Sequence, residues 1–127
     1  MAEAKVMAAK KVLIVDDNLD FVKILEISLK KRGYEVVVAH GGEEGFKKAE
    51  TERPGLILLD IKMPDMDGLM FVRRLKKNEK IREIPVVVLT GFEPMRDLFK
   101  LEGIADYFVK TTDFSVLLKS IERNIKS

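Results

Sequence analysis

The chain of 127 residues contains no cysteine and no tryptophan, and it has a single histidine. The lack of cysteine excludes a disulfide framework, a thiolate nucleophile and a zinc–thiolate site. One histidine excludes a metal site built from several imidazoles. No apolar run approaches the roughly 18 residues of a membrane-spanning helix, and the N-terminal segment lacks the apolar stretch of a secretory signal. We therefore expect a cytoplasmic protein without a membrane segment.

An excess of charge of one sign is also missing, because 23 basic residues face 21 acidic ones and the net charge is +2. A dedicated nucleic-acid binder usually shows an obvious basic excess, so we expect no direct binding of nucleic acid. Hydrophobic residues make up 46% of the chain, which is enough for a core. A chain of this length forms one domain. We expect residues 1–10 to be an N-terminal tail and residues 11–127 to be that domain.

Five short apolar runs alternate with longer segments of helical periodicity. The runs are rich in β-branched residues and lack polar alternation, which is typical of parallel strands covered on both faces. They lie at 12–15, 36–39, 56–59, 86–89 and 107–109. Because parallel strands need crossover connections, the pattern predicts an α/β fold: a doubly wound, five-stranded parallel sheet with helices on both faces.

Each apolar run is followed by a segment with a helical pattern. Asp17 or Asn18 can cap the first helix, which Gly33 ends. The second spans about 42–52, and the third lies near 69–75. The fourth is expected to be short and to end at Gly103, with Pro94 in its first turn. The fifth begins near Asp113.

Polar side chains follow four of the five expected strands. The first strand ends in Asp16 and Asp17, the third in Asp60, the fourth in Thr90 and the fifth in Lys110. The carboxyl ends of parallel strands share one edge of a sheet, where ligands of open α/β sheets bind. Three carboxylates held together repel one another, and a hard cation such as Mg²⁺ suits these oxygen ligands. Together with a hydroxyl and an ammonium group, they form a site suited to phosphoryl transfer onto a carboxylate.

Four segments resemble the receiver domain of bacterial two-component response regulators. They are VLIVDDN, LILLDIKMPDMDG, VVVLTG and ADYFVK, and the resemblance spans residues 11–126. The pattern D-x-x-M-P-x-M-D-G at 60–68 is the most diagnostic. The resemblance implies a flavodoxin-like (βα)5 fold with strand order 2-1-3-4-5, either as a chemotaxis-type single-domain regulator or as the N-terminal receiver of a longer one.

The same resemblance implies the metal site. Asp60 would be the phosphoacceptor. Asp17 and Asp60 would bind Mg²⁺ directly, with Mn²⁺ as a possible substitute, and the backbone carbonyl of Lys62 would be a further ligand. Asp16 would reach the ion mainly through water.

It also implies the residues that hold and sense the phosphoryl group. Thr90 would hydrogen-bond the group and Lys110 would pair with it. Tyr107 matches the switch aromatic, whose ring moves inward when Thr90 is drawn toward the phosphate. Lys62 and Phe92 occupy positions that vary in the family and would tune the lifetime of the aspartyl phosphate. The alternative is that Lys62 is solvated and Phe92 packs on the surface or on a partner.

Three residues of the loop after Asp60 are better read as shaping that loop than as catalytic. Pro64 and Gly68 fit a turn, in which Gly68 can take a positive φ. Asp67 can cap the third helix.

Two features depart from the family pattern. Thr111 stands where the family usually has proline, so we expect either a trans Lys110–Thr111 bond with a shifted loop or a strained cis bond. The interval from Thr90 to Lys110 is also short, and the missing positions fall within 91–103. We therefore expect a short or displaced fourth helix.

The resulting hypothesis is a phosphoacceptor rather than an enzyme, one that assists its own phosphorylation and dephosphorylation. It would take a phosphoryl group from a sensor histidine kinase or a histidine phosphotransfer protein. It would then switch the face of the fourth helix, fifth strand and fifth helix for a downstream protein partner or a homodimer. The alternative is an interaction module that keeps the fold and signals without phosphorylation. A flavin-binding enzyme is disfavoured, because Asp16 and Asp17 stand where a phosphate loop would need glycine and hydroxyl groups.

Overall fold

The computed structural model of the chain describes residues 10–91 and 94–126. Most of the expected tail and Phe92 lie outside these residues. Strands and helices alternate along the described chain. They are β1 (Lys11–Val15), α2 (Leu19–Lys31), β2 (Glu35–Ala39), α3 (Gly42–Glu52), β3 (Leu56–Leu59), α4 (Gly68–Lys76), β4 (Val86–Thr90), α5 (Arg96–Lys100), β5 (Asp106–Val109) and α6 (Phe114–Asn124).

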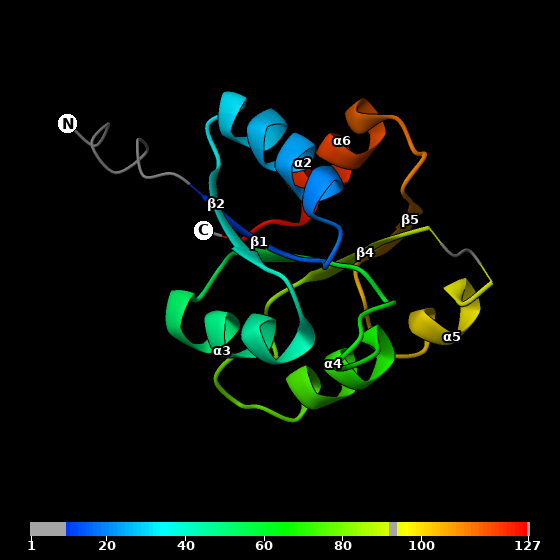
Figure 1. Cartoon of the computed structure of the whole chain (residues 1–127). Helices are drawn as coiled ribbons and strands as arrows, with labels where there is room; N and C mark the ends of the chain where they lie inside the picture. The colour runs from blue at the N-terminus through cyan, green and yellow to red at the C-terminus, as the bar shows by residue number, and fades with distance from the viewer. Residues whose placement is uncertain (1–9, 92–93, 127) are drawn as a thin grey trace.

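The strands form one parallel sheet in the order β2-β1-β3-β4-β5. Helices α2 and α6 cover one face, and α3, α4 and α5 cover the other (Figure 1). The interior strand β1 pairs on both sides, so that Val12 lies between Val36 and Leu56. This arrangement confirms the predicted fold class and strand order. The edge strand β2 is less covered than predicted, since only Ala39 of its five residues is fully buried.

The sheet separates two hydrophobic clusters. Val12 and Ile14 of β1 pack with α2 and α6, whereas Leu13 and Val15 pack with α3, α4 and α5. Successive side chains of a strand point to opposite faces, so a strand buried on both sides needs apolar residues throughout. This requirement explains the unbroken apolar runs of the sequence.

The helix ends are set largely as the sequence predicts. Asn18, and not Asp17, caps α2, because its side-chain oxygen accepts a hydrogen bond from the Phe21 N–H at 3.0 Å. After this helix, Gly33 has a φ of 91°, which a glycine adopts without steric cost. Asp67 caps α4 by accepting a hydrogen bond from the Met70 N–H at 2.8 Å.

Gly68 differs from the prediction, because it does not take a positive φ. Its role is steric instead: a Cβ at this position would lie 2.7 Å from the Cα of Ile61. The Gly68 N–H also donates to the Ile61 carbonyl oxygen at 2.9 Å. Glycine therefore lets the start of α4 approach the backbone that follows β3.

The fourth helix of the sequence is short, as predicted, and spans only Arg96–Lys100. Pro94 lies in a turn before α5 rather than in its first turn, and the helix ends before Gly103. Gly103 has a φ of 78° in the turn that leads to β5. None of the helices within the described residues has the length and apolar character needed to cross a bilayer.

Candidate functional site

The predicted site residues meet at the carboxyl edge of the sheet, where backbone hydrogen bonds tie them to neighbouring strands. The Asp16 N–H donates to the Ala39 carbonyl, and the Asp60 N–H donates to the Val15 carbonyl, both at 3.0 Å. These bonds extend the pairing of the sheet one residue past the strand ends. The backbones of Asp16 and Asp60 are therefore fixed to the sheet.

The carboxylates of Asp16, Asp17 and Asp60 form a cluster. One oxygen from each lies within 4.8 Å of the others. Asp16 is 2% exposed and Asp60 is 6% exposed, whereas Asp17 lies at the surface. Three carboxylates at this separation repel one another and supply the oxygen ligands that Mg²⁺ prefers. The cluster therefore fits a hard divalent cation.

Lys110 brings a positive charge to the two buried carboxylates. Its Nζ lies 2.9 Å from Asp16 Oδ2 and 3.4 Å from Asp60 Oδ2. Burial nevertheless raises the pKa of the Asp16 carboxyl above its ordinary value, because desolvation outweighs the hydrogen bonds from Asn18 N–H and Lys110. The nearby charge of Asp60 raises this pKa further.

Thr90 contacts Lys110 through its backbone, whereas Lys62 contacts Asp60 directly. Thr90 ends β4 and is 1% exposed, and its carbonyl oxygen accepts a hydrogen bond from the Lys110 N–H at 2.7 Å. The Lys62 N–H points to Asp60 Oδ1 at 3.4 Å, while the Lys62 side chain is exposed. Lys62 also lines a hollow of about 240 Å³. The backbone after β3 therefore curls around the Asp60 carboxylate.

Tyr107 is buried, with 3% of its surface exposed. Its ring packs against that of Phe99, with centroids 5.9 Å apart, and Arg96 Cζ lies 5.0 Å from the Tyr107 ring centroid. Arg96 Nη1 also donates to the Tyr107 carbonyl oxygen at 2.9 Å. The predicted switch aromatic is thus in an inward position and is held by α5.

The peptide bond after Lys110 is the trans bond of the first predicted alternative. The described residues contain no cis peptide bond, so the Lys110–Thr111 bond is trans. The Thr112 N–H donates to the Val109 carbonyl at 3.0 Å, which closes a turn directly after β5.

One structural contact of this region was missed by the sequence reasoning. The Asp65 carboxylate accepts hydrogen bonds from the Gly42 N–H at 2.9 Å and the Glu43 N–H at 3.1 Å, so it caps α3 from another loop. These two bonds lower the pKa of the Asp65 carboxyl. The paired Gly41 and Gly42 are the one available signal, because a Cβ on Gly41 would lie 3.1 Å from Asp65 Oδ1.

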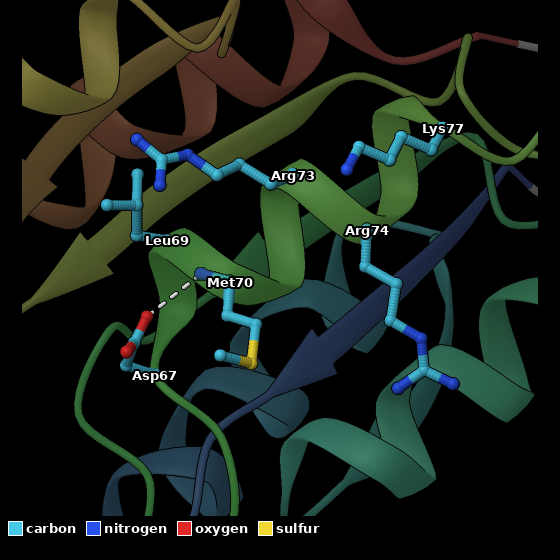
Figure 2. Close-up of a pocket in the computed structure, with 6 residues that line it drawn as sticks. All are labelled: Asp67, Leu69, Met70, Arg73, Arg74 and Lys77. Atoms are coloured by element: carbon cyan, nitrogen blue, oxygen red, sulfur yellow. Dashed lines mark hydrogen bonds between the residues drawn. The ribbon is translucent and has the colours of Figure 1, made fainter.

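Helix α4 carries a basic groove on its outer side (Figure 2). Two of its cations are already paired: Arg73 with Glu102 at 3.1 Å and Arg74 with Glu43 at 2.8 Å. Met70, which lines the groove, is 58% exposed. The two ion pairs connect α4 to the turn after α5 and to the start of α3.

Comparison with known proteins assigns the fold and the motifs of this chain to one family. Residues 12–122 match the model of the response regulator receiver domain family. The chain belongs to this family. The match covers most of α6 and all residues of the five strands except Lys11, so the receiver assignment applies to the described fold.

Individual relatives are consistent with this membership. Protein PilH of Pseudomonas aeruginosa is 35% identical over 113 residues, which cover 87% of this chain and 93% of PilH. The alkaline phosphatase synthesis transcriptional regulatory protein PhoP of Bacillus subtilis is 40% identical over 103 residues, which cover 80% of this chain but only 42% of PhoP. This receiver therefore spans nearly all of one relative and less than half of the other.

A solved relative shows the fold with a ligand. The response regulator TrrA from Thermotoga maritima, in complex with Mg(2+)-BeF, superposes with a TM-score of 0.83 and is 29% identical. The superposition covers 91% of this chain and 99% of that one.

Proposed function

We propose that this receiver accepts a phosphoryl group on Asp60 and uses it to switch a protein-binding face. One observation carries the proposal: the buried Asp60 carboxylate lies beside two further carboxylates and 3.4 Å from the Lys110 ammonium group. A carboxylate in such a site can act as a nucleophile, while the cation and the lysine offset the charge of the phosphoryl oxygens.

The metal site consists of Asp16, Asp17, Asp60 and the backbone carbonyl of Lys62. When bound, Mg²⁺, or Mn²⁺ in its place, would supply positive charge to the carboxylates and to the incoming phosphoryl oxygens. The oxygen-only ligand set supports a hard cation, and the Mg(2+)-BeF complex of TrrA supports this choice.

The donor is a phosphohistidine on a sensor histidine kinase or on a histidine phosphotransfer protein. An Asp60 carboxylate oxygen attacks the phosphorus in line, the phosphorus–nitrogen bond breaks, and the histidine nitrogen leaves with its electron pair. The product is an acyl phosphate on Asp60. Lys110 pairs with the phosphoryl oxygens and the Thr90 hydroxyl donates a hydrogen bond to them.

The output would follow from Thr90 and Tyr107. Tyr107 already lies inward, so a Thr90 side chain drawn toward the phosphoryl group would stabilise this position of the ring and thereby shift the face formed by α5, β5 and α6. Downstream proteins or a second copy of the chain would bind this face. At the α5 end of this face, Leu98 and Leu101 are exposed apolar side chains, at 37% and 84% exposure. Phe99 and Tyr107 are buried and so are not available to a partner.

Lifetime tuning by Lys62 and Phe92 remains part of the proposal. The exposed Lys62 side chain stands beside the loop around Asp60 and can influence access of water to the phosphoryl group.

The test is an intact-mass spectrum after incubation with Mg²⁺ and acetyl phosphate. We expect a mass gain of one phosphoryl group in the parent protein and in Asp97→Asn, which alters an exposed aspartate of α5. We expect no gain in Asp60→Asn or when a chelator is added first. A parent protein that gains no mass, even with a cognate phosphohistidine donor, would contradict the proposal and favour a module that signals by binding alone.

A further inference from the structure

The aromatic ring of Phe21 lies against the ammonium group of Lys110. Lys110 Nζ is 4.6 Å from the centroid of this ring, within the roughly 6 Å at which a cation is attracted to an aromatic face. Phe21 belongs to α2, whereas Lys110 directly follows β5. The ammonium group is therefore bounded by carboxylates and by an aromatic ring.

Phe21 is held in this position by a closed circuit of contacts. The Asn18 N–H donates to Asp16 Oδ1 at 2.9 Å, and Asn18 Oδ1 accepts from the Phe21 N–H at 3.0 Å. The Phe21 ring contacts Lys110, and Lys110 Nζ returns to Asp16 Oδ2 at 2.9 Å. The cap of α2 thus fixes the backbone of Phe21 relative to the carboxylate that Lys110 binds.

The low solvent exposure of Lys110 strengthens its contact with the Phe21 ring. The Lys110 side chain is 19% exposed, and an aromatic–cation contact is stronger when it is shielded from water. The residue after Lys110 is threonine, so no pyrrolidine ring restricts the backbone there. The contacts with Asp16, Asp60 and Phe21 are therefore the restraints on the lysine side chain that the structure shows.

The ring has a chemical advantage over a further carboxylate. An ammonium group has three N–H donors, and Asp16 and Asp60 already accept from it. An aromatic face attracts the positive charge but adds no oxygen that would compete with a phosphoryl group for the remaining donor.

We infer that Phe21 is a positioning residue that holds the Lys110 ammonium group in place for phosphoryl transfer to Asp60. The inference rests on the proposed function and adds a residue to it. Phe21 itself contacts neither the acceptor nor the phosphoryl group; it acts through the lysine.

The kinetic test compares Phe21→Leu, which keeps an apolar side chain without an aromatic face, with Phe21→Tyr, which keeps the face. Phe114→Leu is the matched control, because Phe114 is also half-buried, lines the same hollow of about 190 Å³ and faces another cation, Arg32. With acetyl phosphate and saturating Mg²⁺, Phe21→Leu should lower the maximal phosphorylation rate about threefold to tenfold. The KM for acetyl phosphate should stay unchanged, and Phe21→Tyr and Phe114→Leu should behave like the parent.

A second measurement does not depend on phosphorylation. In NMR spectra of lysine-labelled protein, the Lys110 ε-methylene protons, assigned by their loss in Lys110→Arg, should be shifted upfield by the ring of Phe21. This shift should persist in Phe21→Tyr and disappear in Phe21→Leu.

An unchanged rate in Phe21→Leu, or an equal loss in Phe114→Leu, would overturn the inference, as would an ordinary Lys110 shift in the parent. A parent protein that accepts no phosphoryl group would instead contradict the proposed function, while the NMR shift would still report on the contact.

Discussion

At the scale of single residues, the buried ionised carboxylate of Asp16 is a cost in stability. Its carboxylate is 2% exposed, and burial raises its pKa despite the ion pair with Lys110. The ionised form is therefore less favourable in the folded protein than in the unfolded chain. In its ionised form Asp16 therefore fits the proposed metal site better than it fits a stabilising role in the fold.

Replacing Asp16 by asparagine should stabilise the metal-free protein. At about pH 7 in chelator, Asp16→Asn should have a higher free energy of unfolding than the parent, because it buries no ionised carboxyl. The pKa of the Asp16 carboxyl is higher in the folded protein than in the unfolded chain. The carboxyl therefore destabilises the fold least at a pH below its pKa in the unfolded chain, and more as the pH rises through its pKa in the folded protein. The advantage of the variant should therefore shrink as the pH falls from about 7 toward the ordinary range of aspartate near 4.

Urea denaturation at several pH values measures this difference. Asp20→Asn serves as a control, because it removes an exposed carboxylate of α2 and should show no such trend. A variant less stable than the parent across this pH range would mean that the Lys110 ion pair outweighs the burial of Asp16.

The sequence predicted individual residues well where a local pattern or a strand end defined them. Asp16, Asp60, Thr90 and Lys110 follow apolar runs, and parallel pairing alone brings them to one edge. The role of Gly68 was predicted wrongly. A glycine is needed both for a positive φ and for a close approach to another part of the backbone, here Ile61, and the sequence does not distinguish the two.

At the scale of elements, α5 is the shortest helix of the described residues, and it nevertheless holds the side chain of Tyr107 in place. It has five residues, and its main anchor is Phe99. Arg96 lies over the Tyr107 ring and donates to the Tyr107 carbonyl. These contacts couple the position of α5 to the proposed switch.

Removing the Arg96 side chain should loosen this coupling. Arg96→Ala loses an aromatic–cation contact and a charged hydrogen bond, so we expect a loss of about 1–2 kcal/mol in the free energy of unfolding. Tyr107 should also become more accessible to acrylamide. The chain has two tyrosines and no tryptophan, so quenching in a Tyr34→Phe background reports on Tyr107 alone.

The control is Arg82→Ala, since Arg82 is exposed and its recorded ion pair with Glu83 is long, at 3.9 Å. Equal quenching of Tyr107 in the Arg96→Ala variant and the parent would show that Arg96 does not hold the ring inward.

The elements were predicted more reliably than the contacts between them. A short helix before β5 follows from the interval between Thr90 and Lys110, and the structure confirms it. The cap that Asp65 provides for α3 joins residues more than twenty positions apart. No local periodicity reports such a contact, because it depends on how two loops meet.

At the scale of the whole molecule, the sheet separates two sets of helices. Each set contacts a residue of the segment 107–110. Phe21 of α2 contacts Lys110 on one side of the sheet, and Tyr107 packs with Phe99 of α5 on the other. One layer therefore contacts Lys110, which pairs with the Asp60 carboxylate, and the other contacts Tyr107, three residues earlier in the chain. Occupation of the site is expected to affect the stability of the entire fold.

Binding of Mg²⁺ should stabilise the parent protein globally. A ligand that binds only the folded state, at a concentration of about 100 times its Kd, adds about 2.7 kcal/mol to the free energy of unfolding. Thermal denaturation with increasing Mg²⁺ should therefore show a rising Tm, and a chelator should reverse the increase.

Asp17→Asn should lose most of this increase, because it removes a proposed ligand that lies at the surface and has little role in packing. Asp20→Asn, one helical turn later, should keep it. An equal rise of the Tm in Asp17→Asn would place the cation elsewhere.

The order of the site residues along the chain also determines when during synthesis the charges of the carboxylates are balanced by Lys110. Asp16, Asp17 and Asp60 all lie before α4, whereas Lys110 follows β5, the strand at the far edge of the sheet. A nascent chain that has paired only β1, β2 and β3 would hold three crowded carboxylates without the ammonium group that pairs with Asp16 and Asp60. Docking of the last strand therefore relieves a repulsion that the first half of the chain creates, which favours completion of the fold over arrest at a half-built sheet.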